Sequence, residues 1–269
     1  MAATCPLGFN TEYLRTQVRA TYDRVAREPH GEFHFHRGPD YAHAYLGYDR
    51  EELAMLPEAC TARFAGVGNP LRIADQDPRI GIRPGETVLD HACGAGMDLL
   101  LAARRVGPTG KAIGVDMTPA MCECATAAAE LAELADRVEI RLGYYESLPV
   151  ADESVDVVIS NGVVNLAPDK LRVFREIHRV LKPGGRLLLG DVVVRRELTL
   201  DARSDPDLWA ACIAGALVER ELPELAAAAG LTAGQIVEYF DCFRNTSAEV
   251  KVAKDLQVRS ANFVAHKGL

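Results

Sequence analysis

The stretch that decides the fold is Val88-Leu89-Asp90-His91-Ala92-Cys93-Gly94-Ala95-Gly96-Met97-Asp98. Apolar residues that favour a β-strand lead into a turn with two glycines, and a helical pattern begins at Met97. Such a turn lets a ligand approach the backbone closely and exposes the amides at the start of the helix. An ordinary tight turn between a strand and a helix can carry the same glycines. Asp116 strengthens the functional interpretation, because it ends the next predicted strand, 22 positions after Gly94, where it can accept hydrogen bonds from a ribose diol.

From Glu86 onward, short β-forming runs alternate with alanine-rich helical patterns. This alternation predicts an α/β fold with a doubly wound, Rossmann-like parallel sheet of about seven strands and helices on both faces. The predicted strands cover residues 87–89, 112–115, 138–142, 155–159, 186–194, 235–240 and 260–265. The predicted helices cover residues 11–27, 50–64, 97–106, 119–134, 168–181, 205–220 and 221–229. Residues 1–80 are expected to form a helical N-terminal lid region, and residues 81–269 the cofactor-binding domain.

Composition narrows the class of protein and its partners. The 269 residues are 48% hydrophobic and 25% charged, which is typical of a globular chain with a sizeable core. A formal net charge of −8 argues against nucleic acid and anionic lipid as partners. The longest uncharged apolar run, Leu208 to Val218, is far shorter than the roughly 20 residues of a membrane span. With no secretory signal pattern at the start, a cytosolic location and reduced thiols are expected for the seven cysteines.

Three features favour S-adenosylmethionine (SAM) over a dinucleotide as the ligand of the glycine turn. Leu99 stands where the dinucleotide fingerprint has Gly or Ala. Asp90 lies at the end of the first strand, where its carboxylate would repel a pyrophosphate but attract the sulfonium and ammonium groups of SAM. Met117 follows the ribose-binding acid and can lie flat on an adenine. SAM is therefore the expected cofactor.

Several longer motifs fall in the order of a known family. They are Asp90 to Gly96, Val106 to Lys111, Ile113 to Pro119, Ser160 to Leu166, Asp169-Lys170 and Arg179 to Arg186. Together they resemble the arsenite methyltransferase-like group of class I SAM-dependent methyltransferases, over about residues 32–243. The resemblance implies a seven-stranded doubly wound sheet whose last strand is antiparallel, with SAM over the carboxyl ends of the strands.

The resemblance also implies roles for individual residues in SAM binding. Ala92, Gly94 and Gly96 would shape the methionine pocket, near Asp90. Asp116 would bind the ribose hydroxyls and Met117 would contact the adenine. Tyr145 and Glu146 match the adenine-binding segment of the family. Asn161, at the end of the fourth strand, would face the cofactor and the substrate.

The chain departs from the family at the arsenic-binding thiols. Arsenite methyltransferases bind trivalent arsenic through cysteine thiolates, which are soft ligands for a soft centre. One cysteine belongs in Gly-Cys-Gly-Asn-Pro, where this chain has Val67, and another in Ser-Asn-Cys, where it has Gly162. Cys212 matches a family cysteine, but one thiol does not replace a chelating set. The expected acceptor is therefore a small molecule other than arsenite.

A histidine-rich segment lies upstream of the sheet, in residues 30–41. His34 and His36 alternate with Phe33 and Phe35, so an extended chain would place both imidazoles on one face. Three interpretations stay open: a lid over the active site, a surface loop anchored by its phenylalanines, and a metal site. We expect no metal, and we take His34 or His36 as the candidate general base, with Arg37 beside them at the acceptor.

The sequence thus predicts a methyltransferase that uses SAM and acts on a small molecule. Two alternatives remain. One is an arsenite methyltransferase that uses Cys212 with other thiols, and the other is a protein that binds SAM without transferring its methyl group.

Overall fold

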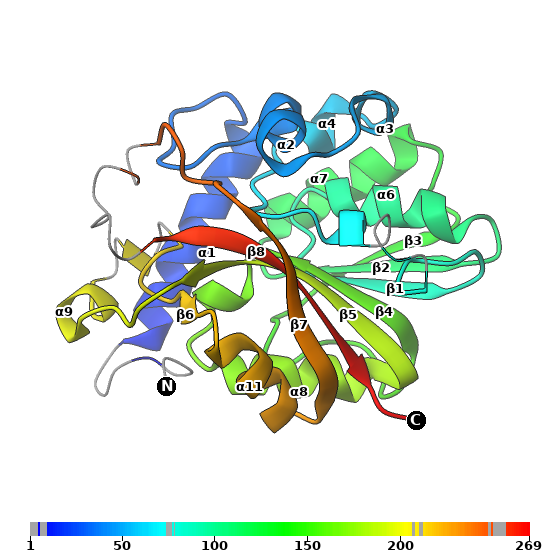
Figure 1. Cartoon of the computed structure of the whole chain (residues 1–269). Helices are drawn as coiled ribbons and strands as arrows, with labels where there is room; N and C mark the ends of the chain where they lie inside the picture. The colour runs from blue at the N-terminus through cyan, green and yellow to red at the C-terminus, as the bar shows by residue number, and fades with distance from the viewer. Residues whose placement is uncertain are drawn as a thin grey trace.

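A twisted sheet runs through the centre of the molecule in the computed structural model (Figure 1). The structure describes residues 5, 10–73, 77, 79–205, 208–209, 212–246, 249 and 257–269. The strand order is β3-β2-β1-β4-β5-β8-β7, with β6 paired to β5 off this path. The strands are β1 (Thr87–His91), β2 (Lys111–Asp116), β3 (Val138–Leu142), β4 (Val155–Asn161), β5 (Leu181–Val194), β6 (Leu217–Val218), β7 (Leu231–Phe240) and β8 (Arg259–Lys267).

The doubly wound class predicted from the sequence is confirmed. Strands β1 to β5 pair in parallel, whereas β8 runs antiparallel to both β5 and β7. Central strands such as β4 are apolar on both faces because helices cover both sides. The sheet has eight strands rather than the expected seven, since the two-residue β6 joins it beside Val193 and Val194.

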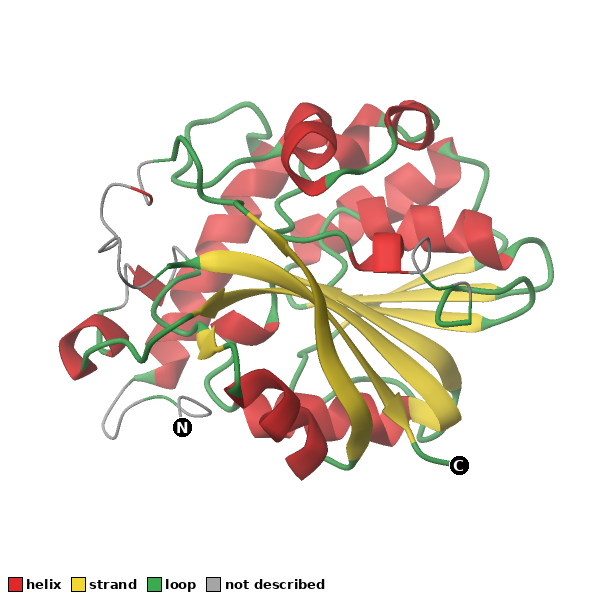
Figure 2. Cartoon of the chain, in the orientation of Figure 1, coloured by secondary structure: helices red, strands yellow, loops and turns green. Residues whose placement is uncertain are grey.

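Helices cover both faces of the sheet, as Figure 2 shows. One face carries α6 (Met97–Val106) and α7 (Pro119–Leu131), and the other carries α8 (Lys170–Val180) and α11 (Glu221–Ala228). The helix α1 (Thr11–Arg27) lies across the carboxyl ends of the strands and contacts α7. The remaining helices are α2 (Gly38–Leu46), α3 (Arg50–Ala54), α4 (Glu58–Thr61), α9 (Leu200–Arg203) and the 3-10 turns η1 (Pro70–Arg72) and η2 (Val164–Leu166). Leu14 and Val18 of α1 belong to the same apolar cluster as Leu99 and Leu100 of α6, so the N-terminal region shares its core with the sheet. A domain boundary near residue 80 stays a prediction.

The predicted helix over residues 205–220 is wrong in its second half. Residues 206–207 and 210–211 lie outside the described residues, but Cys212 has a left-handed backbone with φ of 61°. A Cβ added to Gly215 would lie 1.8 Å from the carbonyl oxygen of Asn165, so the backbone at Gly215 packs directly against η2 and leaves no room for a side chain. Leu217 and Val218 instead pair with β5. Tertiary pairing therefore overrides the local helical pattern.

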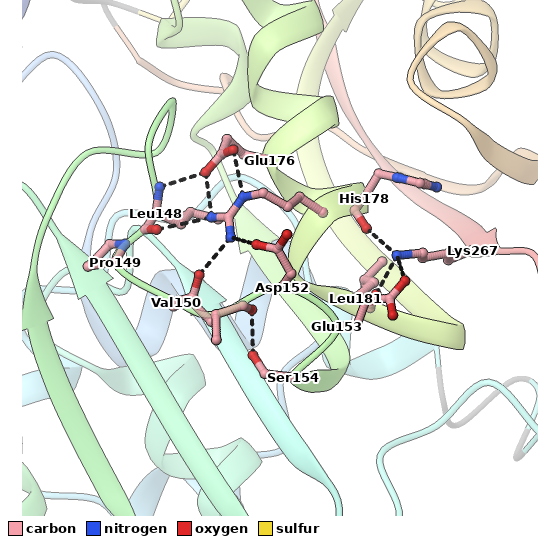
Figure 3. Close-up of polar contacts among 12 residues, drawn as sticks. Leu148, Pro149, Val150, Asp152, Glu153, Ser154, Glu176, His178, Leu181 and Lys267 are labelled. Carbon is pink, nitrogen blue, oxygen red and sulfur yellow. Dashed lines mark hydrogen bonds and ion pairs between the residues drawn. The ribbon is translucent and has the colours of Figure 1, made fainter.

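An arginine of α8 anchors the loop that joins β3 to β4 (Figure 3). Arg179 donates to the carbonyl oxygens of Leu148 and Val150 at 3.1 and 2.8 Å, and to both carboxylate oxygens of Glu176. Glu176 accepts in turn from the Leu148 amide at 2.9 Å. These bonds hold the loop at its base, and the same loop carries Tyr145 and Glu146.

Among the described residues, no helix is long and apolar enough to span a membrane.

Candidate functional site

A cavity opens where the glycine turn meets the carboxyl ends of β1, β2 and β4. The N-terminal region of the chain covers the cavity with Val18 and Tyr22 of α1 and with the segment from Cys60 to Gly66. Seven of the nine residues predicted for the cofactor line this cavity: Asp90, Ala92, Gly94, Asp116, Met117, Tyr145 and Asn161. The topology therefore brings together residues that are far apart in the chain, since parallel strands end at one edge of the sheet.

The other two predicted cofactor residues, Gly96 and Glu146, do not line the cavity. Gly96 precedes α6 with φ of 92°, and a Cβ there would lie 3.3 Å from Cβ of Ala125. Glu146 is buried and accepts from Arg15 of α1 at 3.0 Å. Gly96 thus permits a tight turn against α7, and Glu146 ties the β3–β4 loop to α1. Their direct contact with a cofactor stays a prediction.

Asp116 is held rigidly at the end of β2. Its carboxylate accepts from the Gly94 amide at 2.9 Å and from the Thr118 amide at 2.8 Å, one bond to each oxygen. Each carboxylate oxygen keeps a further lone pair, so the group can still accept from two hydroxyls. Burial raises the pKa of Asp116, and the backbone bonds oppose that shift. This is a suitable acceptor for a ribose diol.

Two more carboxylates, those of Asp90 and Asp98, lie near the glycine turn, and Asp98 was not predicted from the sequence. Asp98 of α6 accepts from the Tyr48 hydroxyl at 2.7 Å and from the side-chain amide of Asn161 at 2.9 Å. Burial, followed by the charges of Asp98 and Asp116, raises the pKa of Asp90 well above its ordinary value. A bound cation would relieve this crowding of negative charge. The sulfonium and ammonium groups of SAM fit that requirement, so the residues present fit the expected cofactor.

Asn161 clamps the segment that begins at Gly66. Its side-chain oxygen accepts from the amides of Val67 and Gly68 at 2.8 and 3.0 Å, and its nitrogen donates to the Gly68 carbonyl at 2.9 Å. Asn262 of β8 completes the clamp, accepting from the Asn69 amide at 3.1 Å and donating to the Asn69 carbonyl at 2.8 Å. Asn161 is thus a structural tie as well as a lining residue. Sequence reasoning missed Asn262, because nothing local to β8 marks it.

The three predicted catalytic residues lie outside the cavity that holds the cofactor residues. His36 bonds through Nε2 to the Arg244 carbonyl at 2.7 Å and stacks on Tyr41. His34 meets the edge of Phe35. Arg37 packs over Phe33, 4.1 Å from the ring centroid, and donates to the carbonyl oxygens of Pro29 and Gly31.

The phenylalanines of this segment, Phe33 and Phe35, pack against the core as expected for an anchored segment. Among the described residues, no group of three or more His, Cys, Asp or Glu side chains could hold a metal ion. A general-base role for His34 or His36 stays a prediction.

His91 connects the glycine turn to the β3–β4 loop. Its ring lies fully buried, with Nδ1 3.2 Å from the Ser160 hydroxyl and Nε2 3.3 Å from the Tyr145 carbonyl. Because a carbonyl can only accept, Nε2 carries the proton and Nδ1 accepts from Ser160. Burial lowers the pKa of His91 to about 4. The neutral imidazole therefore positions Tyr145 rather than exchanging protons near neutral pH.

The low pKa of His91 predicts a loss of stability in acid. Between pH 6.5 and about 4 the unfolded chain binds a proton that the folded chain does not, so the free energy of unfolding should fall as pH is lowered through that window. The His91 contribution to this fall should reach roughly 3 kcal/mol. Urea unfolding at several pH values should show a shallower fall for His91→Gln than for the unchanged protein. Identical slopes for His91→Gln and the unchanged protein would contradict the assignment.

The positions of the two missing family thiols lie side by side. A Cβ on Gly162 would be 3.5 Å from a methyl carbon of Val67, so valine fills the space next to the glycine. A smaller cavity adjoins the larger one and shares Tyr22, Ala65 and Gly66 with it. Cys212 and Cys242 both line this smaller cavity, together with His36. Burial raises the pKa of both thiols, that of Cys242 to about 12.

Comparison with known proteins gives a consistent result. A family model described as a methyltransferase domain matches residues 82–230. An arsenite methyltransferase of Halobacterium salinarum is 47% identical over 71% of this chain and 47% of its own length. One of Aquipseudomonas alcaligenes is 40% identical over 66% of this chain and 54% of its own. The crystal structure of an arsenic(III) S-adenosylmethionine methyltransferase from Chlamydomonas reinhardtii is 34% identical, with a TM-score of 0.69 over 82% of this chain and 73% of that one. The chain spans about half the length of the curated relatives it matches.

Proposed function

The chain belongs to the arsenite methyltransferase-like group of SAM-dependent methyltransferases, and on that premise we propose that it methylates a small molecule other than arsenite. The observation that carries the proposal is the pair Val67 and Gly162, which puts a methyl group and a bare backbone where the resemblance implies two arsenic-binding thiols. Neither Val67 nor Gly162 has a sulfur atom that could bind arsenic, which is a soft centre.

The chemistry asked of the protein is mainly positioning. SAM supplies a methyl group on a sulfonium, which is activated by its own positive charge. Asp116 would hold the ribose, Asp90 and Asp98 would offset the positive charges, and the glycine turn would admit the methionyl part. Holding the acceptor in line with the methyl carbon then supplies most of the rate enhancement. An oxygen or nitrogen acceptor also needs a base, for which His36 is the nearer candidate because it lines the adjoining cavity.

Arsenite is the second candidate acceptor, and one observation favours it. Cys212 and Cys242 line the same small cavity, so the chain brings together two thiols that are 30 positions apart in sequence. Two thiolates can chelate a trivalent arsenic centre, although both are protonated at neutral pH in the absence of a ligand. The relatives named arsenite methyltransferases support this candidate.

An assay with arsenite distinguishes the two candidates. Purified protein with SAM, arsenite and a thiol reductant should produce no methylated arsenic above a control without enzyme. The Halobacterium salinarum relative serves as the positive control. Steady formation of monomethylarsenic that Cys242→Ser abolishes would overturn the first candidate and establish the second. Release of S-adenosylhomocysteine in the presence of a desalted small-molecule extract, but not with arsenite, is the result that the first candidate predicts.

A further inference from the structure

Arg63 is the one cationic side chain that lines the cofactor cavity, as far as the chain is described. It follows α4 and is half-buried, on the side of the cavity closed by α1. Figure 1 shows α4 close to α7, and the two helices are in contact. The other charged residues of the lining are Asp90, Asp98 and Asp116, which cluster around the glycine turn and the end of β2. The cavity is thus acidic near the turn and basic on the side of α1 and α4.

The guanidinium of Arg63 is fixed in place but incompletely used. Its Nε donates to the Ala26 carbonyl at the end of α1 at 2.7 Å, and its Nη1 donates to the Ala59 carbonyl of α4 at 2.9 Å. The structure gives Nη2 no hydrogen-bond partner within the described ranges. A preoriented guanidinium with spare N–H groups at a cavity wall is suited to bind a carboxylate.

SAM carries one anionic group, the α-carboxylate of its methionyl part. The start of α6 is the other place where an anion could bind, because helix amides are exposed there. Asp98 already occupies the first turn of α6, and Asp90 of the neighbouring strand β1 lines the same cavity. A third carboxylate at this helix end would meet two like charges. Arg63 is therefore the group in the lining best suited to the anion.

We propose that Arg63 binds the α-carboxylate of SAM, an inference that rests on the proposed function. The site then matches the donor group by group: carboxylates for the sulfonium and ammonium, Asp116 for the ribose, and Arg63 for the carboxylate. The contact also links cofactor binding to closure of the cavity, because the same guanidinium ties α1 to α4. The contact between Arg63 and the carboxylate also makes the protein selective for methyl donors that keep the α-carboxylate as well as the ammonium group.

Decarboxylated SAM tests this proposal, because it keeps the sulfonium and the ammonium but lacks the carboxylate. Calorimetric titration should show that the unchanged protein binds SAM about 10 to 100 times more tightly than decarboxylated SAM. Arg63→Gln should bind SAM weaker by the same factor, whereas its affinity for decarboxylated SAM should stay within about twofold of the unchanged protein. Arg63→Lys should keep part of the preference for SAM. The exposed Arg19→Gln is the matched control and should behave as the unchanged protein.

The two ligands separate a cofactor contact from a structural role. If Arg63 only ties α1 to α4, its replacement will weaken both ligands equally, and the proposal is overturned while the proposed function stands. If the unchanged protein binds the two ligands equally well, the proposal is overturned in the same way. If the unchanged protein binds neither ligand, the proposed function itself fails, and this inference fails with it.

Discussion

Asn161→Ala is expected to lower the free energy of unfolding by about 3–5 kcal/mol, the largest effect of a single replacement near the site. The change removes the acceptor of two backbone amides, those of Val67 and Gly68, and a donor to the buried Asp98 carboxylate. Each buried group left without a partner costs about 1–3 kcal/mol. Urea unfolding followed by circular dichroism measures the change.

A second asparagine provides the control for this prediction. Asn10 caps α1, where its side chain accepts from the Tyr13 amide at 2.9 Å. Asn10→Ala removes a single exposed bond and should cost about 1 kcal/mol. Equal losses for the two variants would mean that the Val67–Gly68 segment is held by something other than Asn161. In that case the account of how the cavity wall is positioned would be incorrect.

Asp116→Ala should weaken SAM binding by about 1.5–3 kcal/mol, or roughly 10- to 150-fold, because the charge-assisted hydrogen bonds to the ribose diol are lost. Asp116→Asn keeps one acceptor oxygen and should lose less. Isothermal titration calorimetry with SAM gives the affinities. Asp136→Ala, which changes an exposed acid in the turn between α7 and β3, is the control and should bind SAM normally. Unchanged affinity in Asp116→Ala, in a protein that melts normally, would mean that Asp116 does not contact the ribose.

Much of the fold could be predicted from sequence, since the signals for these elements are local. The helix over 97–106 and the strand over 138–142 have the predicted bounds. In both segments the hydrophobic period and the flanking turn residues agree. The tail was harder to predict, because β6 is two residues long and exists only through pairing with β5. The helix α2 was missed as well, although Pro39 near its start is a standard signal.

The site could be predicted where a motif carries it and not where folding assembles it. The glycine turn and Asp116 lie close in sequence and were identified, and the cavity brings them together. Arg63, Asp98 and Cys242 carry no local signature. Arg63 and Asp98 are recognised only because α1, α4 and the sheet meet around the cofactor cavity. Cys242 is recognised only because it lines the smaller cavity together with Cys212. Pairings of this kind depend on contacts between distant segments, which a single sequence does not encode in any short pattern.

A crystal structure of the protein with S-adenosylhomocysteine tests the central claim most directly. The ligand is expected to occupy the cavity beside the glycine turn, with its ribose hydroxyls within hydrogen-bond distance of Asp116 and its adenine against Met117. Its sulfur is expected to point towards the smaller cavity, on the side where Tyr22, Ala65 and Gly66 line both cavities. A ligand bound elsewhere, or a cavity that stays empty at saturating ligand, would contradict the account.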